Sequence, residues 1–256
     1  MVGAAAHADA LDFERGYSER AAARAASHPL GVTLRDDAVP RAHMLNLLRV
    51  TVHEATPTEL TAALDALQGH LLHRAAYVEH DALGHALAAP LREQGFVVER
   101  HLYMTLRRGR DRDAGQGLAE EVDEATHAAV ETTTTRERPH GGDEEVVRQL
   151  AWARAALRAA VATRFFVGST DGVRAATATL LSRGAVAQLE DVATLTAHRR
   201  RGLARAVCSA AVDAALAAGS ALVFVVANDG DWPKELYGKL GFEAAGASWA
   251  VTRDPA

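Results

Sequence analysis

The stretch "VATLTAHRRRGLARAV", residues 192–207, decides how the rest of the chain is interpreted. A run with β-branched residues leads into three consecutive arginines and a glycine, and an Ala/Leu-rich helical pattern follows. This order predicts a strand, a turn and the first turn of a helix, where free backbone N–H groups face outward. A glycine there lets a phosphate approach the backbone, and arginines add charge-assisted hydrogen bonds. The stretch therefore predicts a polyanion site, most simply one for a pyrophosphate.

Composition and net charge limit the kinds of ligand that such a site could bind. The chain has 256 residues, of which 48% are hydrophobic and 24% charged, which is typical of a globular protein. Its formal net charge of -5 argues against a general nucleic-acid binder, because such proteins need a basic excess. The N-terminal residues have no basic start and no long apolar run, and no stretch reaches the length of a membrane span. We expect a cytoplasmic protein that binds neither nucleic acid nor a membrane.

Histidine and cysteine give no pattern typical of a metal site. His70, His73, His80 and His85 lie close in sequence, but they lack the His-Glu-x-x-His spacing and no cysteine accompanies them. The single cysteine, Cys208, lies among alanines in a helical pattern, which predicts a buried structural thiol. We therefore expect no metal.

The elements of the C-terminal half are readable from apolar spacing and turn residues. A helix begins after Asp143, which is a plausible N-cap. Three consecutive antiparallel strands are predicted over roughly 164–170, 173–181 and 185–195, followed by a helix that Gly219 ends. A continuous apolar run, "ALVFVVAN", predicts a strand buried on both faces. A short helix and a last strand follow, so the order predicts an α/β arrangement around a mixed sheet.

A charged segment without apolar periodicity, "RRGRDRDAGQG" at 107–117, predicts a domain boundary. We expect an N-terminal domain over 1–110 and a C-terminal domain over 118–256. The segment "LREQGFVVERHLYMTL" at 91–106 parallels "YGKLGFEAAGASWAVT" at 237–252, since each has a helix end, then Gly-Phe, then a strand. This echo suggests that half of the second domain's architecture recurs in the first.

The pattern Arg-x-x-Gly-x-Ala at 199–204, followed by "ALVFVVAN" and "LYGKLGF", resembles the coenzyme-A pyrophosphate loop and adjoining elements of the GNAT superfamily of N-acetyltransferases. The resemblance implies an α/β (α+β) GNAT fold, a mixed, mostly antiparallel twisted sheet flanked by helices. The N-terminal domain then resembles a degenerate partial GNAT domain, because it has the Gly-Phe echo without the loop. The implied activity is acyl-CoA-dependent N-acyl transfer, with acetyl-CoA as co-substrate and a primary amine of a small molecule as acceptor.

The resemblance also implies roles for individual positions. Backbone groups near the end of the central strand would pair with the pantetheine arm, and the loop would wrap the pyrophosphate. Tyr237 matches the usual general acid, and Glu190 is the best candidate for the base, with strand alternation sending Asp191 to the opposite face. Asn228 is a candidate cofactor contact, although it lies farther before Tyr237 than is usual in the family. The full set of expected cofactor contacts is Val192, Ala193, Thr194, Leu195, Arg199, Arg200, Arg201, Gly202, Leu203, Ala204, Asn228 and Tyr237.

Several alternatives remain open at the level of sequence. The chain could be a GNAT-like protein that binds acyl-CoA or scaffolds a partner without turnover. A water relay could replace Glu190 as the base. Of the three arginines in the loop, we expect Arg200 to contribute least beyond its backbone. The acceptor and the acyl-chain preference are undefined, and the family's frequent dimers make a homodimer one of the states that the resemblance allows.

Overall fold

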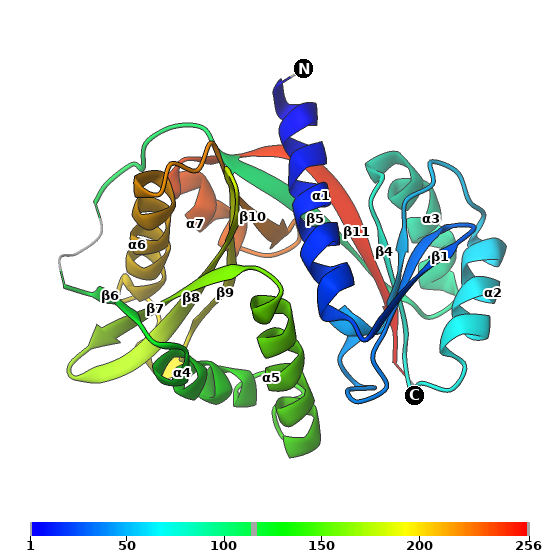
Figure 1. Cartoon of the computed structure of the whole chain (residues 1–256), viewed down its shortest axis with the longest axis horizontal. Helices are drawn as coiled ribbons and strands as arrows, with labels where there is room; N and C mark the ends of the chain where they lie inside the picture. The colour runs from blue at the N-terminus through cyan, green and yellow to red at the C-terminus, as the bar shows by residue number, and fades with distance from the viewer. Residues whose placement is uncertain (1, 114–116, 255–256) are drawn as a thin grey trace.

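The computed structural model describes residues 2–113 and 117–254, and eleven strands of these residues form one mixed sheet (Figure 1). The strand order is β1-β2-β3-β4-β11-β5-β10-β9-β8-β7-β6. Only the pairs β3–β4 and β9–β10 are parallel, so the expectation of a mixed, mostly antiparallel sheet is confirmed. The strands are β1 (Arg24–His28), β2 (Gly31–Arg35), β3 (Leu47–Val50), β4 (Arg74–Val78), β5 (Val97–Leu106), β6 (Ala119–Val122), β7 (Ala162–Thr170), β8 (Val173–Arg183), β9 (Val186–Thr194), β10 (Leu222–Asn228) and β11 (Phe242–Arg253).

Helices cover both faces of the sheet. They are α1 (Val2–Ala21), α2 (Pro57–Gln68), α3 (Asp81–Glu93), α4 (Glu124–Arg136), α5 (Glu144–Ala159), α6 (Leu203–Ala217) and α7 (Pro233–Leu240), with short 3₁₀ turns η1 (His43–Leu45) and η2 (Thr196–His198). None of the described helices is long and apolar enough to cross a lipid bilayer.

The two halves of the chain repeat one topology. In each half a strand leads through a helix to a parallel strand, then through a second helix to a long final strand: β3-α2-β4-α3-β5 and β9-α6-β10-α7-β11. At the start of each final strand, a glycine in the left-handed region, Gly95 or Gly241, is followed by a buried phenylalanine, Phe96 or Phe242. The echo in the sequence therefore corresponds to a repeated unit of structure.

The final strands of the two halves are exchanged. β5, from the N-terminal half, lies between β10 and β11, while β11, from the C-terminal half, lies between β5 and β4. The expected division into 1–110 and 118–256 stays a prediction about units of sequence, and part of the expected linker lies outside the described residues. The strands that precede the linker and those that follow it form one continuous sheet, in which β11 and β5 have exchanged places.

Side-chain alternation along β5 explains how one strand serves both halves. Val98 packs in the cluster under α2 and α3, and Met104 packs in the cluster under α6 and α7, both on one face. Tyr103 points to the opposite face, where it contacts the apolar side of α1. α1 therefore lies over the middle of the sheet, in front of β5 and β11 (Figure 1).

Candidate active site

The site begins where the parallel strands β9 and β10 separate. Their register runs from Val186 opposite Leu222 to Leu189 opposite Val225 and stops there. β9 continues to Thr194 along β8, but beyond Leu189 its other edge has no strand partner among the described residues. Backbone groups on that edge need a partner, and an extended chain can supply one as an added strand. This edge is the one where the sequence placed Val192, Ala193, Thr194 and Leu195.

A β-bulge lies at the point of separation. The register between β8 and β9 shifts by one residue next to Asp191, whose φ of 52° is in the left-handed region. Thr177 Oγ1 donates a hydrogen bond of 3.0 Å to the carbonyl oxygen of Asp191 and stabilises this geometry. The bulge interrupts the alternation of side chains along β9.

The expectation that Glu190 and Asp191 point to opposite faces is therefore wrong. Arg158 Nη2 of α5 binds the Asp191 carboxylate at 2.6 Å, and the Glu190 carboxylate accepts a hydrogen bond from Gln188, which also reaches Glu14 of α1. Both carboxylates lie on the face of the sheet that α1 and α5 cover. Sequence spacing alone could not reveal this, because alternation holds only in an unbulged strand.

The loop after β9 presents an open helix N-terminus. Gly202 is the N-cap of α6 with φ of 84°, and no side chain caps the helix. Within the described residues, a Cβ atom at this glycine would contact only the Leu118 Cδ1 atom, at 3.9 Å, and none of their other atoms lies within 4 Å of it. Arg200 also has a left-handed φ, 62°, and the residues from Arg199 to Gly202 are exposed. Leu203 is buried in the core, so its contribution to a ligand would come from its backbone amide, as would that of the half-buried Ala204.

Side chains at the loop leave donors and acceptors for a ligand. Arg199 Nε donates to the Thr194 carbonyl oxygen at 3.2 Å, and Arg201 forms an ion pair of 2.7 Å with Asp171 in the β7–β8 turn. Thr194 Oγ1 and His198 Nδ1 are buried and have no hydrogen-bond partner among the described residues. Buried polar groups are normally paired. These two atoms, together with the uncapped amides, fit a bound polyanion such as a pyrophosphate.

The equivalent helix of the N-terminal half is closed to such a ligand. α2 begins with a capping box, in which Thr56 Oγ1 accepts from the Glu59 amide and the Glu59 carboxylate accepts from the Thr56 amide. The amides of Thr56 and Glu59 are thus satisfied within the chain, Pro57 has no N–H to offer, and the loop before α2 carries no arginine. The repeated topology therefore offers one open anion site, at α6.

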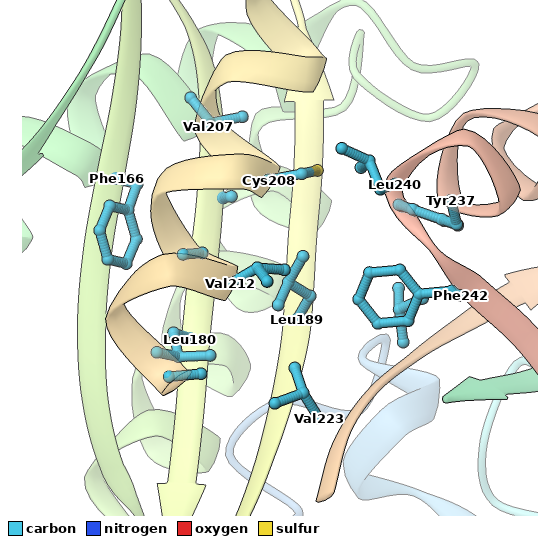
Figure 2. Close-up of a cluster of buried hydrophobic side chains, with 14 of the residues drawn as sticks. Phe166, Leu180, Leu189, Val207, Cys208, Val212, Val223, Tyr237, Leu240 and Phe242 are labelled. Carbon is cyan, nitrogen blue, oxygen red and sulfur yellow. The ribbon is translucent and has the colours of Figure 1, made fainter. Parts of the chain in front are cut away.

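Tyr237 lies on the α6–α7 face of the separation. The side chain is 6% exposed and packs edge-on against the Phe242 ring, with 6.2 Å between ring centroids. Figure 2 shows Tyr237, Leu240 and Phe242 beside the buried side chains of α6. Burial raises the pKa of Tyr237 well above its ordinary value, and nearby Cys208 and Glu190 raise it further. Its hydroxyl therefore keeps its proton at neutral pH and can donate a hydrogen bond.

Of the two neighbouring carboxylates, Glu190 forms no ion pair with an arginine or lysine among the described residues. Burial, then the charges of Asp191 and Glu14, raise the pKa of Glu190 to about 8. Asp191 differs, because Arg158 and Arg154 bind it at 2.6 and 3.4 Å. A carboxylate with a raised pKa can hold or release a proton near neutral pH. The structure thus distinguishes the two neighbours by their surroundings.

Replacing Glu190 with glutamine should make the protein more resistant to high pH. The raised pKa means that the folded wild type keeps this proton while the unfolded chain loses it, so wild-type stability falls as pH rises from about 4.5 toward 8. The variant lacks this loss, and its advantage in free energy of unfolding should reach on the order of 3 kcal/mol above pH 8. Chemical denaturation at pH 5 and pH 9 measures the difference. The exposed Glu54→Gln is the control, and equal pH dependence of both variants would contradict the account.

Asn228 lies away from the other expected contacts. Its side chain has the same parity as Phe224 and Val226, which face α1, whereas Tyr237 lies on the opposite face. Asn228 Nδ2 donates to Glu99 of β5 at 2.7 Å, and Asn228 Oδ1 accepts from the Gly230 amide. The side chain is therefore committed to the turn after β10, and its role as a cofactor contact stays a prediction.

Residues around Glu190 that the sequence did not indicate come from α1, α4 and α5. Glu14 is buried on α1, and Arg158 is held between Glu131 of α4 and Asp191. The signal that could have indicated Glu14 is its position between Phe13 and Tyr17 in the segment 9–26, which has a helical pattern. Among the described residues, no group of three or more His, Cys, Asp or Glu side chains is arranged to hold a metal ion.

Comparison with known proteins identifies a family pattern over this region. A protein-family model described as the acetyltransferase (GNAT) family matches residues 122–242. The matched segment runs from the end of β6 to the first residue of β11, and it contains the arginine loop, Glu190 and Tyr237. No curated protein matches the chain at a significant level.

Two solved structures share the architecture of nearly the whole chain. A functionally unknown conserved protein from Staphylococcus epidermidis ATCC 12228 has a TM-score of 0.71 at 11% identity, over 90% of this chain and 93% of that one. A GCN5-related N-acetyltransferase from Kribbella flavida has a TM-score of 0.65 at 20% identity, over 98% and 96%. At these identities the likeness shows the fold alone, and it includes both halves.

Proposed function

We propose that this chain, whose residues 122–242 match the acetyltransferase (GNAT) family model, transfers an acyl group, most simply acetyl, from its coenzyme-A thioester to a primary amine of a small molecule. The proposal rests on one observation. The N-terminus of α6, which follows three arginines in the sequence, is uncapped and lies beside the edge of β9 that has no strand partner among the described residues. This combination offers backbone donors to a pyrophosphate and an edge to an extended pantetheine arm.

Binding would use the loop and the strand edge together. The amides of the first turn of α6 would donate to the pyrophosphate, with Arg199 and Arg200 adding charge. Thr194 Oγ1 and His198 Nδ1 would gain the partners that they lack. Backbone groups of residues 190–195 would hold the extended arm, so that the thioester reaches the point where β9 and β10 separate.

The chemistry would take place between Glu190 and Tyr237. Glu190 accepts a proton from the acceptor ammonium, because only the neutral amine can attack the thioester carbonyl. The new C–N bond forms as the C–S bond breaks. The Tyr237 hydroxyl gives its proton to the departing sulfur and regains one from the attacking nitrogen, which loses its second proton as the amide forms. Backbone amides at the bulge would stabilise the oxyanion. The products are an N-acyl amine and coenzyme A, with the proton on Glu190 returned to water.

An assay of thiol release tests this function. The purified chain is given acetyl-CoA and a panel of amino acids, polyamines and amino sugars, and free thiol is measured over time. Tyr237→Phe should lower kcat by about 100-fold while leaving acetyl-CoA affinity unchanged, because the ring still packs and only the donor is lost. Acetyl-CoA binding without turnover on any primary amine would favour a protein that binds acyl-CoA without catalysis.

A further inference from the structure

The N-terminal half reaches into the candidate active site through helix α1. Glu14 is buried on the side of α1 that faces the sheet, and its Oε1 accepts a hydrogen bond of 2.7 Å from Gln188 Nε2. The same Gln188 nitrogen donates to Glu190 Oε1. Gln188 is completely buried, so one side-chain amide bridges the two carboxyl groups.

Glu14 is itself held by a network of side chains from four different strands. Tyr103 of β5 donates to Glu14 Oε2, Tyr103 hydrogen-bonds Tyr77 of β4 at 3.1 Å, and Ser248 of β11 donates to Tyr77 at 2.5 Å. Arg49 Nη2 of β3 lies 3.9 Å from Glu14 Oε2. β11 lies between β4 and β5 because the final strands of the two halves are exchanged. The exchange therefore builds a rigid support beneath Glu190.

We infer that Glu14 is a positioning residue: through Gln188 it fixes the orientation of Glu190 and sets the pH at which Glu190 can accept a proton. The inference rests on the proposed function for its consequence in catalysis, but the coupling itself is a property of the chain alone. It assigns the N-terminal half a part in the active site of the C-terminal half. Neither half would hold a correctly placed base without the other.

The other charged side chains near Glu14 and Glu190 are mostly paired with one another. The titratable or charged side chains that face Glu14 and Glu190 from the elements packed there are Tyr17 of α1, Arg49 of β3, Tyr77 and Glu79 of β4, Tyr103 of β5, Glu131 of α4, Arg154 and Arg158 of α5, Asp191 of β9 and Tyr237 of α7. Arg154, Arg158, Glu131 and Asp191 bind one another, and Arg49 binds Glu79. Substitutions of Glu14 and Gln188 are therefore expected to change the titration of Glu190 without breaking these ion pairs.

Two substitutions should move the titration of Glu190 in opposite directions. Glu14→Gln removes a neighbouring negative charge, so the midpoint should fall by at least about half a pH unit. Gln188→Met removes the donor that favours the ionised form, so the midpoint should rise. A generally loosened site would admit water and shift both variants the same way. Opposite shifts are therefore a signature that a merely structural role does not produce.

Carbon-13 NMR of the full chain, labelled at the glutamate carboxyl carbons, measures these midpoints directly. Glu190→Gln identifies the resonance, and Asp9→Asn, an exposed charge removal on the same helix, is the matched control. We expect a lower midpoint in Glu14→Gln, a higher one in Gln188→Met and no change in Asp9→Asn. The inference is overturned if Glu14→Gln titrates like the control, or if both variants shift in one direction.

The pH dependence of kcat/KM, measured beside the NMR titration, tests this inference separately from the proposed function. With an amine substrate in hand, the acid limb of the kcat/KM profile should move in the same direction as the NMR midpoint in each variant. An absence of acetyl-CoA binding by the wild type would count against the proposed function, while the NMR titration would still decide the coupling. An acid limb that stays fixed while the NMR midpoint moves would overturn the role of Glu14 in positioning the base.

Discussion

Replacing Gly202 with aspartate is expected to lower the affinity for acetyl-CoA by at least about 100-fold, because two charge-assisted interactions of about 1.5–3 kcal/mol would be lost or reversed. Gly202 has a φ of 84° and leaves open space in front of the uncapped α6 amides. An aspartate there would bring its carboxylate to those amides, satisfy them within the chain and repel the pyrophosphate. Equilibrium dialysis with labelled acetyl-CoA measures the loss.

The matched control for this variant lies at the other end of the same helix. Gly219 follows α6 with φ of 81°, and a Cβ atom there meets no atom within 4 Å. Gly219→Asp therefore adds the same charge at a similar backbone angle, away from the loop. It should keep wild-type affinity despite a small loss of stability. Equal affinity of both variants would mean that the cofactor does not bind at the start of α6.

Separating the two halves is expected to abolish folding of each. A fragment of residues 117–256 lacks β5, which lies between β10 and β11. It also loses the buried side chains Val98, Tyr103 and Met104, each of which contributes about 1.5–3 kcal/mol by burial. Total stabilities of domains are about 5–15 kcal/mol, so the fragment should show no cooperative thermal unfolding by circular dichroism.

Adding back the missing half should restore the fold. Fragments 1–113 and 117–256, expressed together, keep every strand of the sheet and break only the segment between β5 and β6. They should co-purify, unfold cooperatively and bind acetyl-CoA as one complex. If fragment 117–256 alone unfolds cooperatively with the affinity of the intact chain, the exchanged strands are dispensable and two independent domains are the correct description.

Local sequence signals predicted the C-terminal half closely. Asp143 caps α5 as expected, and the turn signals placed β7, β8 and β9 within about three residues of their bounds. The arginine loop was readable because a strand end, a glycine with positive φ and a helix start are consecutive in sequence. Interactions that are local in sequence leave local patterns, so the loop could be predicted from its own residues. Tyr237 was indicated by the family resemblance and Glu190 by its place on the central strand, and the roles of both stay predictions.

What the sequence could not predict depends on contacts between distant segments. The exchange of β5 and β11 leaves no mark in either strand, because each alternates as it would in an unexchanged sheet. Thr132–Thr135 lie in α4, where Thr134 and Thr135 are buried, so tertiary packing overrides their weak helix propensity. The bulge at Asp191 and the approach of Glu14 to Gln188 are further products of packing.

Calorimetric titration of the intact chain with acetyl-CoA tests the central claim most directly, because it counts sites. The repeated topology contains two helices in equivalent positions, of which α6 is open and α2 is closed by its own capping box. We predict one binding site per chain. Two sites would show that the N-terminal half also binds acyl-CoA, and no binding would contradict the assignment of the arginine loop as the cofactor site.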